Sequence, residues 1–307
     1  MPRPRNVAAA AAVGSGLTLS GLYGFLLGEA LLARRAIGVT DARPPSPDGV
    51  YGADFPGRPI TCVLLGDSAA VGYGMERADA TPSAMIGIGL AHLLDAPIDV
   101  RCLAVVGAKA ADVHAQIDAL GDLEPDIAVI VVGTNDVTHQ VSPRTSARQL
   151  GRAVSRLVDL GAEVVVGTCP DLGTIQPIKQ PLRTIARGLS RTLARRQTVA
   201  VVEAGGRAVS LGSLLGVLFM EKRDVMFGVD SFHPSETGYA NMVSVLLPAI
   251  AASLRERERT AAYAGPPRDV MSLDEAASEA SHHAGTQVVK EQGQGRSWAT
   301  VLRRRRG

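Results

Sequence analysis

The sequence is poor in cysteine, in aromatic residues and in net charge, and the shortages of cysteine and of net charge argue against particular classes of protein. Its three cysteines lie in or at the end of apolar runs, which indicates small buried side chains rather than a disulfide framework: Cys62, Cys102 and Cys169. No group of cysteines and histidines has the spacing of zinc ligands, and His282 and His283 lie in a polar stretch. A net charge of +2 gives no overall field that would favour a nucleic-acid partner.

The N-terminal stretch from Val7 to Gly28 carries no charge and follows two arginines. Roughly 20 residues span a bilayer as a helix, whereas the apolar core of a signal peptide is usually about 7 to 15 residues long. Because no small-residue cleavage site stands out at 29–35, we predict that residues 1–35 form an uncleaved membrane anchor. A cleaved signal segment and a buried or disordered Ala/Gly-rich leader stay open as alternatives. With an anchor or an export signal, we expect the folded domain to be extracytoplasmic.

Composition divides the rest of the chain into three parts. Residues 36–59 are rich in Pro, Gly and Asp, which is typical of a linker. Residues 256–307 are polar and aperiodic and end in a run of arginines, which predicts a disordered polar tail with a basic end. The folded domain is therefore expected at 60–255, and the hydrophobic content of 46% is enough for a sizeable core.

Within this domain, apolar runs alternate with helical patterns. Five runs read as strands buried on both faces of a parallel sheet: 60–66, 98–107, 127–133, 163–169 and 199–204. Thr81-Pro82 and Ser142-Pro143 each place a capping hydroxyl before a proline that can start a helix, and a last helix is expected at about 235–254. The pattern predicts an α/β fold, a three-layer α/β/α sandwich with a five-stranded parallel sheet.

Polar and small residues follow several of these strands, at the edge where open α/β sheets bind their ligands. Ser68 stands just after the first strand, Gly107 ends the second, and the residues Gly-Thr-Asn-Asp at 133–136 end the third. Before the last helix, Asp230 lies three residues ahead of His233, which a proline follows. Ser68 thus supplies a hydroxyl and Asn135 an amide. Asp230 supplies a carboxylate and His233 an imidazole.

These residue types suit nucleophilic catalysis by a serine. A serine hydroxyl needs a base to take its proton, and the base needs an acid to orient it, which are roles that His233 and Asp230 can fill for Ser68. The Asn135 amide and the backbone N–H groups of Ser68 and Gly107 could form an oxyanion hole. Asp67 could assist, but it can equally pair with backbone in its own turn.

Taken together, the four blocks resemble the SGNH (GDSL-type) hydrolase family. Gly-Asp-Ser after the first strand, glycine after the second, GxND after the third and DxxHP before the last helix match that family in order, over roughly 60–255. The G-x-S-x-G pattern of α/β-hydrolases fails, because Ala70 stands at the second glycine's place. One departure from the SGNH pattern is Ala69, where the commonest form of the block has leucine.

The resemblance implies a flavodoxin-like fold and hydrolysis of carboxylic esters without a metal or other cofactor. It implies that Ser68 is the nucleophile, that Asp230 and His233 complete the catalytic triad, and that Ser68, Gly107 and Asn135 form the oxyanion hole. The substrate would be a small-molecule or lipid ester. Two other hypotheses stay open: an acyltransferase with the same acyl-enzyme chemistry, and a non-catalytic binding module.

One helix carries a repeated positive charge, with arginines at 183, 187, 191 and 195. Like charges at this spacing repel slightly. The arginines could face an anionic membrane surface, or they could form a solvated basic face.

Overall fold

The computed structural model describes residues 44–175, 177–212, 219, 222–259, 270–282, 286–290 and 298–302. The predicted membrane anchor or signal segment at 1–35 lies outside these residues, as does the first part of the predicted linker.

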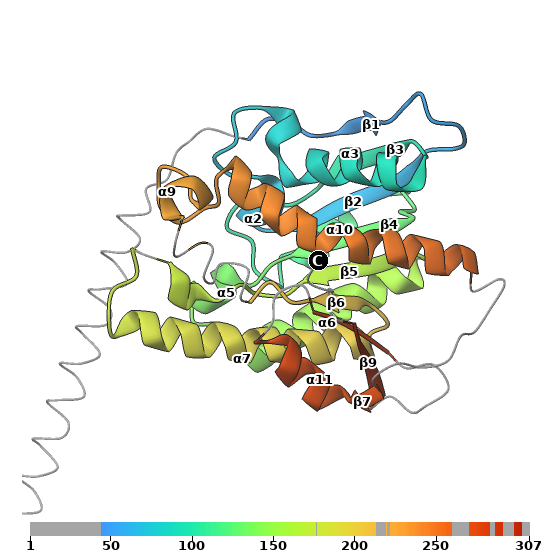
Figure 1. The fold of residues 1–307 in the computed structure, drawn as a ribbon. Helices are drawn as coiled ribbons and strands as arrows, with labels where there is room; N and C mark the ends of the chain where they lie inside the picture. The colour runs from blue at the N-terminus through green and yellow to red at the C-terminus, as the bar shows by residue number, and fades with distance from the viewer. Residues whose placement is uncertain are drawn as a thin grey trace, which may run out of the picture.

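The described residues form a single sheet in the order β1-β3-β2-β4-β5-β6-β8-β9-β7 (Figure 1). Its strands are β1 Gly49–Tyr51, β2 Ile60–Gly66, β3 Ile98–Cys102, β4 Ile127–Val131, β5 Glu163–Gly167, β6 Arg207–Val209, β7 Val270–Ser272, β8 Gln287–Lys290 and β9 Trp298–Leu302. The run β3-β2-β4-β5-β6 is parallel throughout. Taken in chain order, this is the 2-1-3-4-5 arrangement of flavodoxin-like folds, as expected.

Helices cover both faces of the sheet (Figure 1). They are α2 Ser68–Val71, α3 Pro82–Leu94, α4 Val113–Asp118, α5 Thr134–Thr138, α6 Pro143–Asp159, α7 Leu182–Glu203, α9 Arg223–Met226, α10 Glu236–Arg259 and α11 Leu273–Ala280. One core contains side chains of α4, α6, α7 and α11, and the other contains those of α3 and α10. The three-layer sandwich predicted from the sequence is confirmed.

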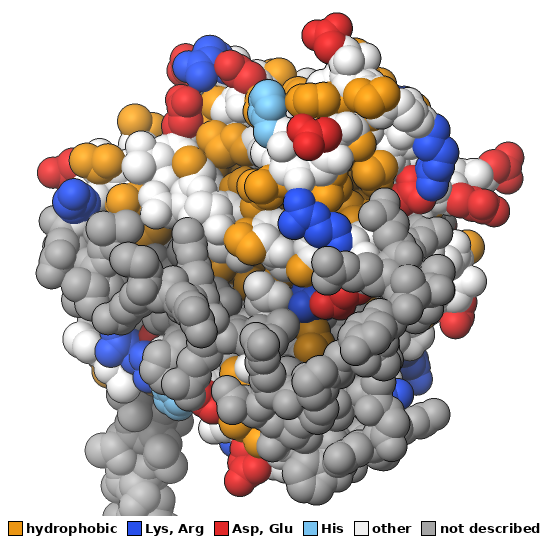
Figure 2. Space-filling view, turned by 45° about the vertical axis from the view of Figure 1, so that its right-hand side comes forward, with side chains coloured by type: hydrophobic (Ala, Val, Ile, Leu, Met, Phe, Trp, Pro, Cys, Tyr) orange, Lys and Arg blue, Asp and Glu red, His pale blue; other side chains and the backbone are white. Residues whose placement is uncertain are grey.

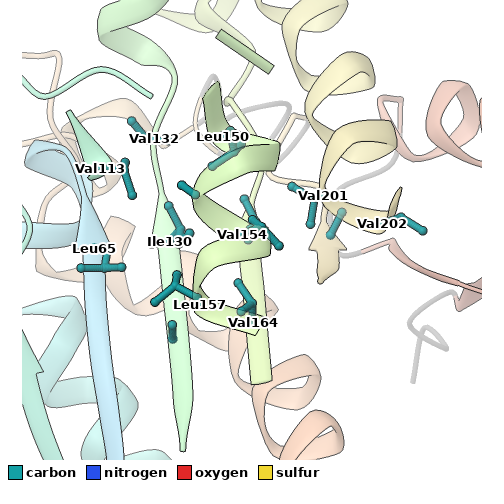
Figure 3. Packing of buried hydrophobic residues seen from close by; sticks show 14 of the residues in the cluster. Leu65, Val113, Ile130, Val132, Leu150, Val154, Leu157, Val164, Val201 and Val202 are labelled. Carbon is teal, nitrogen blue, oxygen red and sulfur yellow. The ribbon is translucent and has the colours of Figure 1, made fainter. Parts of the chain in front are cut away.

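The apolar run of strand β2 is continuous because the strand is buried on both faces. Val63 and Leu65 enter the core under α6, whereas Cys62 and Leu64 enter the core under α3 and α10. Figure 3 shows the first of these cores, in which Leu150, Val154 and Leu157 of α6 pack over the sheet. A strand with helices on both faces has no polar side, so alternation is lost.

Two helix starts lie where the capping hydroxyls predicted them. The Thr81 hydroxyl accepts a hydrogen bond from the Ala84 N–H, and the Ser142 hydroxyl accepts one from the Thr145 N–H. In both helices proline occupies the first turn, where its missing N–H costs nothing.

The predicted fifth strand, 199–204, is wrong. These residues end the long helix α7, and the fifth parallel strand is β6, a few residues later. The run VAVVEA is rich in β-branched residues, but Val201 and Val202 are buried as the last members of a helical series that begins at Ala186. A short apolar run does not distinguish a buried helix from a buried strand.

The predicted disordered tail is also wrong where the structure describes it. Within 256–307, β8 pairs with β6 and with β9, β9 pairs with β7, and α11 packs on the same core as α6. The polar composition hid an amphipathic helix whose start carries a capping box between Ser272 and Glu275. Similarly, β1 lies inside the predicted linker and pairs with β3.

By length and composition alone, one helix of the described residues could cross a membrane: Glu236–Glu256 within α10. It is 61% buried in the protein and supplies Tyr239, Leu246 and Ile250 to the core. This helix is a core element of the domain. On the face shown in Figure 2, acidic and basic side chains are interspersed, in keeping with the small net charge.

The arginines repeated along α7 have partners within the fold. Arg187 and Arg191 lie beside the buried Asp171 carboxylate, Arg195 pairs with Asp274 of α11, and Arg183 donates to the Ile178 carbonyl. Their spacing therefore serves the docking of the loop after β5 and of α11 onto this helix.

The tail strands should contribute to the stability of the domain. Val288 of β8 is fully buried between β6 and β9, so Val288→Asp should lower the free energy of unfolding by about 3 kcal/mol or more, because a carboxylate there has no partner. Chemical denaturation measures this loss. The exposed Lys290 of the same strand is the control, since Lys290→Asp should change the stability little. Equal stability of both variants would show that the tail does not pack on the domain in solution.

Candidate active site

The turn after β2 presents Ser68 at the edge of the sheet. Gly66 has a φ of +129°, and a Cβ at this position would lie 1.9 Å from the Val131 carbonyl oxygen of the neighbouring strand. The Asp67 N–H then donates to the same carbonyl over 3.0 Å, and Ser68 begins the short helix α2. Only glycine permits this close approach, so it fixes where the hydroxyl emerges.

A buried amide holds the turn from the other side. The Gln116 side chain of α4 accepts from the Gly66 N–H over 2.7 Å and donates to the Gly66 carbonyl over 2.8 Å. Gln116 is 4% exposed, and both of its polar atoms are used on one residue. Sequence reasoning missed this positioning residue, because a lone glutamine in a helix carries no signal of its partner.

Ser68, His233 and Asp230 form a continuous hydrogen-bonded chain. Ser68 Oγ lies 3.0 Å from His233 Nε2, and His233 Nδ1 lies 2.6 Å from Asp230 Oδ2. With the proton on Nδ1 facing the carboxylate, Nε2 is left to accept the serine hydroxyl's hydrogen bond. The structure thus brings together the three residues that the sequence singled out, although Ser68 and His233 lie 165 positions apart in the chain.

The second oxygen of Asp230 is held by the backbone. Its Oδ1 accepts hydrogen bonds from the N–H groups of Phe232 and His233, each 2.9 Å long. Burial acts to raise the pKa of Asp230, but the His233 imidazole and these two N–H groups outweigh it, and the net pKa is lower than usual. The carboxylate is therefore ionised at neutral pH.

Two aromatic rings contact the imidazole. The Tyr73 ring lies 4.3 Å from the His233 ring between centroids, and the Phe232 ring lies 4.9 Å away, nearly perpendicular. Tyr73 follows the serine turn, where its N–H donates to the Ser68 carbonyl. Neither ring was predicted from the sequence. Both limit the rotation of the imidazole and its access to water.

Gly107 and Asn135 lie on two loops that are joined to each other. Asn135 Nδ2 donates to the carbonyl of Ala108 over 3.1 Å, which uses one of its two N–H groups. Gly107 is exposed, with a φ of +85° and open space where a Cβ would lie. Its loop reaches the serine turn through the hydrogen bond from the Val105 N–H to the Gly66 carbonyl.

Within the described ranges, the backbone N–H groups of Ser68 and Gly107 donate to no protein acceptor. For Ser68 this follows from its place in the first turn of α2, where helical N–H groups have no partner of their own. Both groups are therefore available to a substrate oxygen.

Asp67 is buried next to the serine. Its Oδ1 accepts from the Ala69 N–H over 3.0 Å, so it caps α2. This is the pairing with backbone in its own turn that the sequence left open. Burial raises the pKa of Asp67 from 3.8 to about 6, although the Ala69 N–H and the nearby His233 oppose the shift. Asp136 is buried as well; it accepts from the Ala110 N–H and stabilises the loop that carries Asn135.

A small apolar cavity of about 50 Å³ opens beside Ser68 and His233. Its walls come from the strand ends, the loop after β5 and α10, and they include Leu172, Ile175, Leu211, Phe219 and Met242. Among the described residues, no three His, Cys, Asp or Glu side chains lie close enough together to hold a metal ion.

The fold is a doubly wound α/β sandwich, and its candidate site joins a serine, a histidine and an aspartate at the carboxyl edge of the parallel sheet. A model of the GDSL-like lipase/acylhydrolase family matches residues 64–240, more than half of the chain. The chain belongs to this family, as the sequence blocks suggested, and as a member it is a carboxylic ester hydrolase.

Individual proteins agree with this assignment. The chain is 39% identical over 273 residues to a GDSL-like esterase, Rv1075c, of Mycobacterium tuberculosis (strain ATCC 25618 / H37Rv), covering 84% of this chain and 86% of that one. Among solved structures, the fold is similar to LAE5, an alpha/beta hydrolase enzyme from the metagenome of Lake Arreo, Spain, with a TM-score of 0.51, 17% identity and coverage of 64% and 96%. It is also similar to the lipase/acylhydrolase from Enterococcus faecalis, with a TM-score of 0.50, 18% identity and coverage of 63% and 96%.

The raised pKa of Asp67 makes the stability of the protein depend on pH. The folded state holds this proton more tightly than the unfolded state, so Asp67 costs nothing below pH 4, and its cost grows to about 3 kcal/mol as the pH rises through 6. Asp67→Asn keeps an oxygen for the Ala69 N–H without the charge. The stability of this variant relative to the wild type should therefore rise between pH 4 and pH 7. Urea denaturation across this range tests it, and a difference that does not change with pH would contradict the shift.

Proposed function

We propose that the protein is a serine esterase in which Ser68 attacks the ester carbonyl, His233 is the general base and Asp230 orients it. The observation that carries this proposal is the continuous hydrogen-bonded chain from Ser68 Oγ through the imidazole to the ionised Asp230 carboxylate. A hydroxyl that lies 3.0 Å from an unprotonated imidazole nitrogen can lose its proton as it attacks.

The reaction proceeds in two halves. Ser68 Oγ bonds to the carbonyl carbon while His233 Nε2 takes the hydroxyl proton, and the imidazolium then gives that proton to the leaving alcohol. Water, deprotonated by His233, releases the acid from the acyl-enzyme and restores the serine. Asp230 stays ionised throughout and stabilises the imidazolium of each half.

The negative charge on the carbonyl oxygen would be stabilised by three donors. These are the N–H groups of Ser68 and Gly107, which have no acceptor among the described residues, and the second N–H of the Asn135 amide. The bond from Asn135 to Ala108 supports this role, because it ties the side-chain donor to the loop that carries the Gly107 donor.

The substrate we propose carries a short acyl group. The cavity beside Ser68 is largely apolar and has a volume of about 50 Å³, which suits an acyl group of a few carbon atoms. We further propose that the uncharged stretch between Val7 and Gly28 anchors the protein to a membrane, with the hydrolase domain on the extracytoplasmic side.

Ser68→Ala should abolish ester cleavage and leave the fold intact, because the methyl group replaces the nucleophile without disturbing the turn. The measurement is hydrolysis of p-nitrophenyl esters from acetate to laurate by the full-length protein, with circular dichroism to check folding. The wild type should favour the short esters. Ser244→Ala, an exposed serine of α10, is the matched control and should retain full activity. Retained activity in Ser68→Ala would refute the proposal that Ser68 is the nucleophile.

Asn135→Ala should reduce kcat by roughly 10²–10³, with little change in KM, because an oxyanion donor acts on the transition state more than on the bound ester. Asn241→Ala removes a half-buried amide of α10 that likewise donates to a backbone carbonyl, that of Thr237. This control should keep its kcat. If Asn135→Ala also keeps it, the amide serves only the loop.

A further inference from the structure

Four exposed valines flank the candidate active site. Val105 and Val106 precede Gly107 and are 55% and 45% exposed, whereas Val225 and Val229 precede Asp230 and are 50% and 105% exposed. Single exposed apolar side chains are common on proteins, but these four gather on two segments that adjoin the site: Val105 and Val106 on the loop after β3, and Val225 and Val229 on α9 and the turn that follows it. Val105 is bonded to the serine turn, and Val225 accepts a hydrogen bond from the Ser235 hydroxyl next to the DxxHP block.

The described chain begins at this same end of the molecule. Strand β1 runs antiparallel to β3, so the residues before Gly49 lie at the carboxyl end of β3, and Asp48 Oδ1 accepts from the Cys102 N–H over 2.8 Å. In Figure 1 the chain starts on the left, where α2, α5 and α9 also lie. From Gly28 to Asp48 the chain has about 20 residues, which span at most about 65 Å. An anchor within 7–28 therefore joins the domain at the end that carries the site.

We propose that this end of the domain docks on a lipid bilayer, with Val105, Val106, Val225 and Val229 inserted at its surface. The substrate is then a short-chain acyl ester of an alcohol that resides in the bilayer: the small cavity takes the acyl group, and the apolar rim receives the alcohol. This inference rests on the proposed function, since it takes Ser68 as nucleophile and the segment within 7–28 as anchor.

The orientation of the domain relative to the bilayer can be measured in the full-length protein, reconstituted in phosphatidylcholine vesicles. An environment-sensitive NBD fluorophore is attached to Val229→Cys or to Leu160→Cys, and wild type labelled in parallel corrects for reaction of the native cysteines. Leu160 is 48% exposed and lies at the opposite end of the sheet, just before β5. We expect a blue shift of emission on vesicle addition at position 229 and none at position 160.

The possible outcomes distinguish the docking surface, the membrane anchor and the esterase reaction from one another. A shift at neither position, at both, or at 160 alone overturns the docking surface, provided that the protein floats with the vesicles. A protein that hydrolyses p-nitrophenyl acetate but does not float overturns the anchor and the docking surface together, while the esterase stands. A protein that floats and shifts at 229 but hydrolyses no ester supports the surface and refutes the proposed reaction.

Activity gives a second, independent readout. Hexadecyl acetate in the vesicles is compared with p-nitrophenyl acetate in water, in the variant Val225→Ser/Val229→Ser. Its turnover of hexadecyl acetate should fall tenfold or more, since removing even one of the two valines from an apolar surface costs about a factor of ten, and its turnover of the soluble ester should not change. The control Leu93→Ser/Leu160→Ser changes two exposed apolar residues at the far end of the sheet and should affect neither ester. Equal loss on both esters, or no loss on either, contradicts the proposal.

Discussion

Strand β2 lies between β3 and β4 in the parallel sheet, and its last residue must approach β4 more closely than any side chain allows. The Val131 carbonyl lies where a Cβ of Gly66 would be, and Gln116 bonds both backbone groups of the same glycine. The position of Ser68 follows from this contact, because the turn can leave the sheet in one direction only. The loops of Gly107 and Asn135 are then built around that turn, through Val105 and through Ala108.

The parallel sheet and the candidate site were predictable from the sequence because both have local signals. Four of the five expected strands appear, since each is a continuous apolar run with helices on both sides. Thr81 and Ser142 cap their helices as predicted, because the hydroxyl accepts a free N–H of the first turn and the proline that follows has the φ of a helix start. Parallel strands bring their carboxyl ends to one edge, so motifs far apart in sequence meet there without any further information.

What the sequence concealed depends on partners that lie far away in the chain. The run at 199–204 has the residues of a strand, yet its place on α7 is set by packing against α6 and the sheet. Strands β7, β8 and β9 are short and are surrounded by polar residues, so they bury too few side chains for a periodic signal. They are stabilised by pairing: β8 pairs with the edge strand β6, β9 with β8, and β7 with β9. The sequence does not show which sheet edge a short strand will cover.

Two carboxylates flank the serine, and their surroundings shift their pKa values in opposite directions. Asp230 is partly exposed and is held ionised by the imidazole and two N–H groups, whereas Asp67 is buried, and burial raises its pKa to about 6 although backbone N–H groups oppose the shift. The difference suits the two positions. Asp230 contacts His233 directly, so its charge favours the tautomer with the proton on Nδ1, which the proposed general base requires. Asp67 acts on His233 through its charge without a hydrogen bond, and the attraction between them opposes the shift caused by burial. An imidazolium formed during the proposed reaction would therefore draw Asp67 further toward its ionised form, so that the buried carboxylate stabilises positive charge when that charge appears.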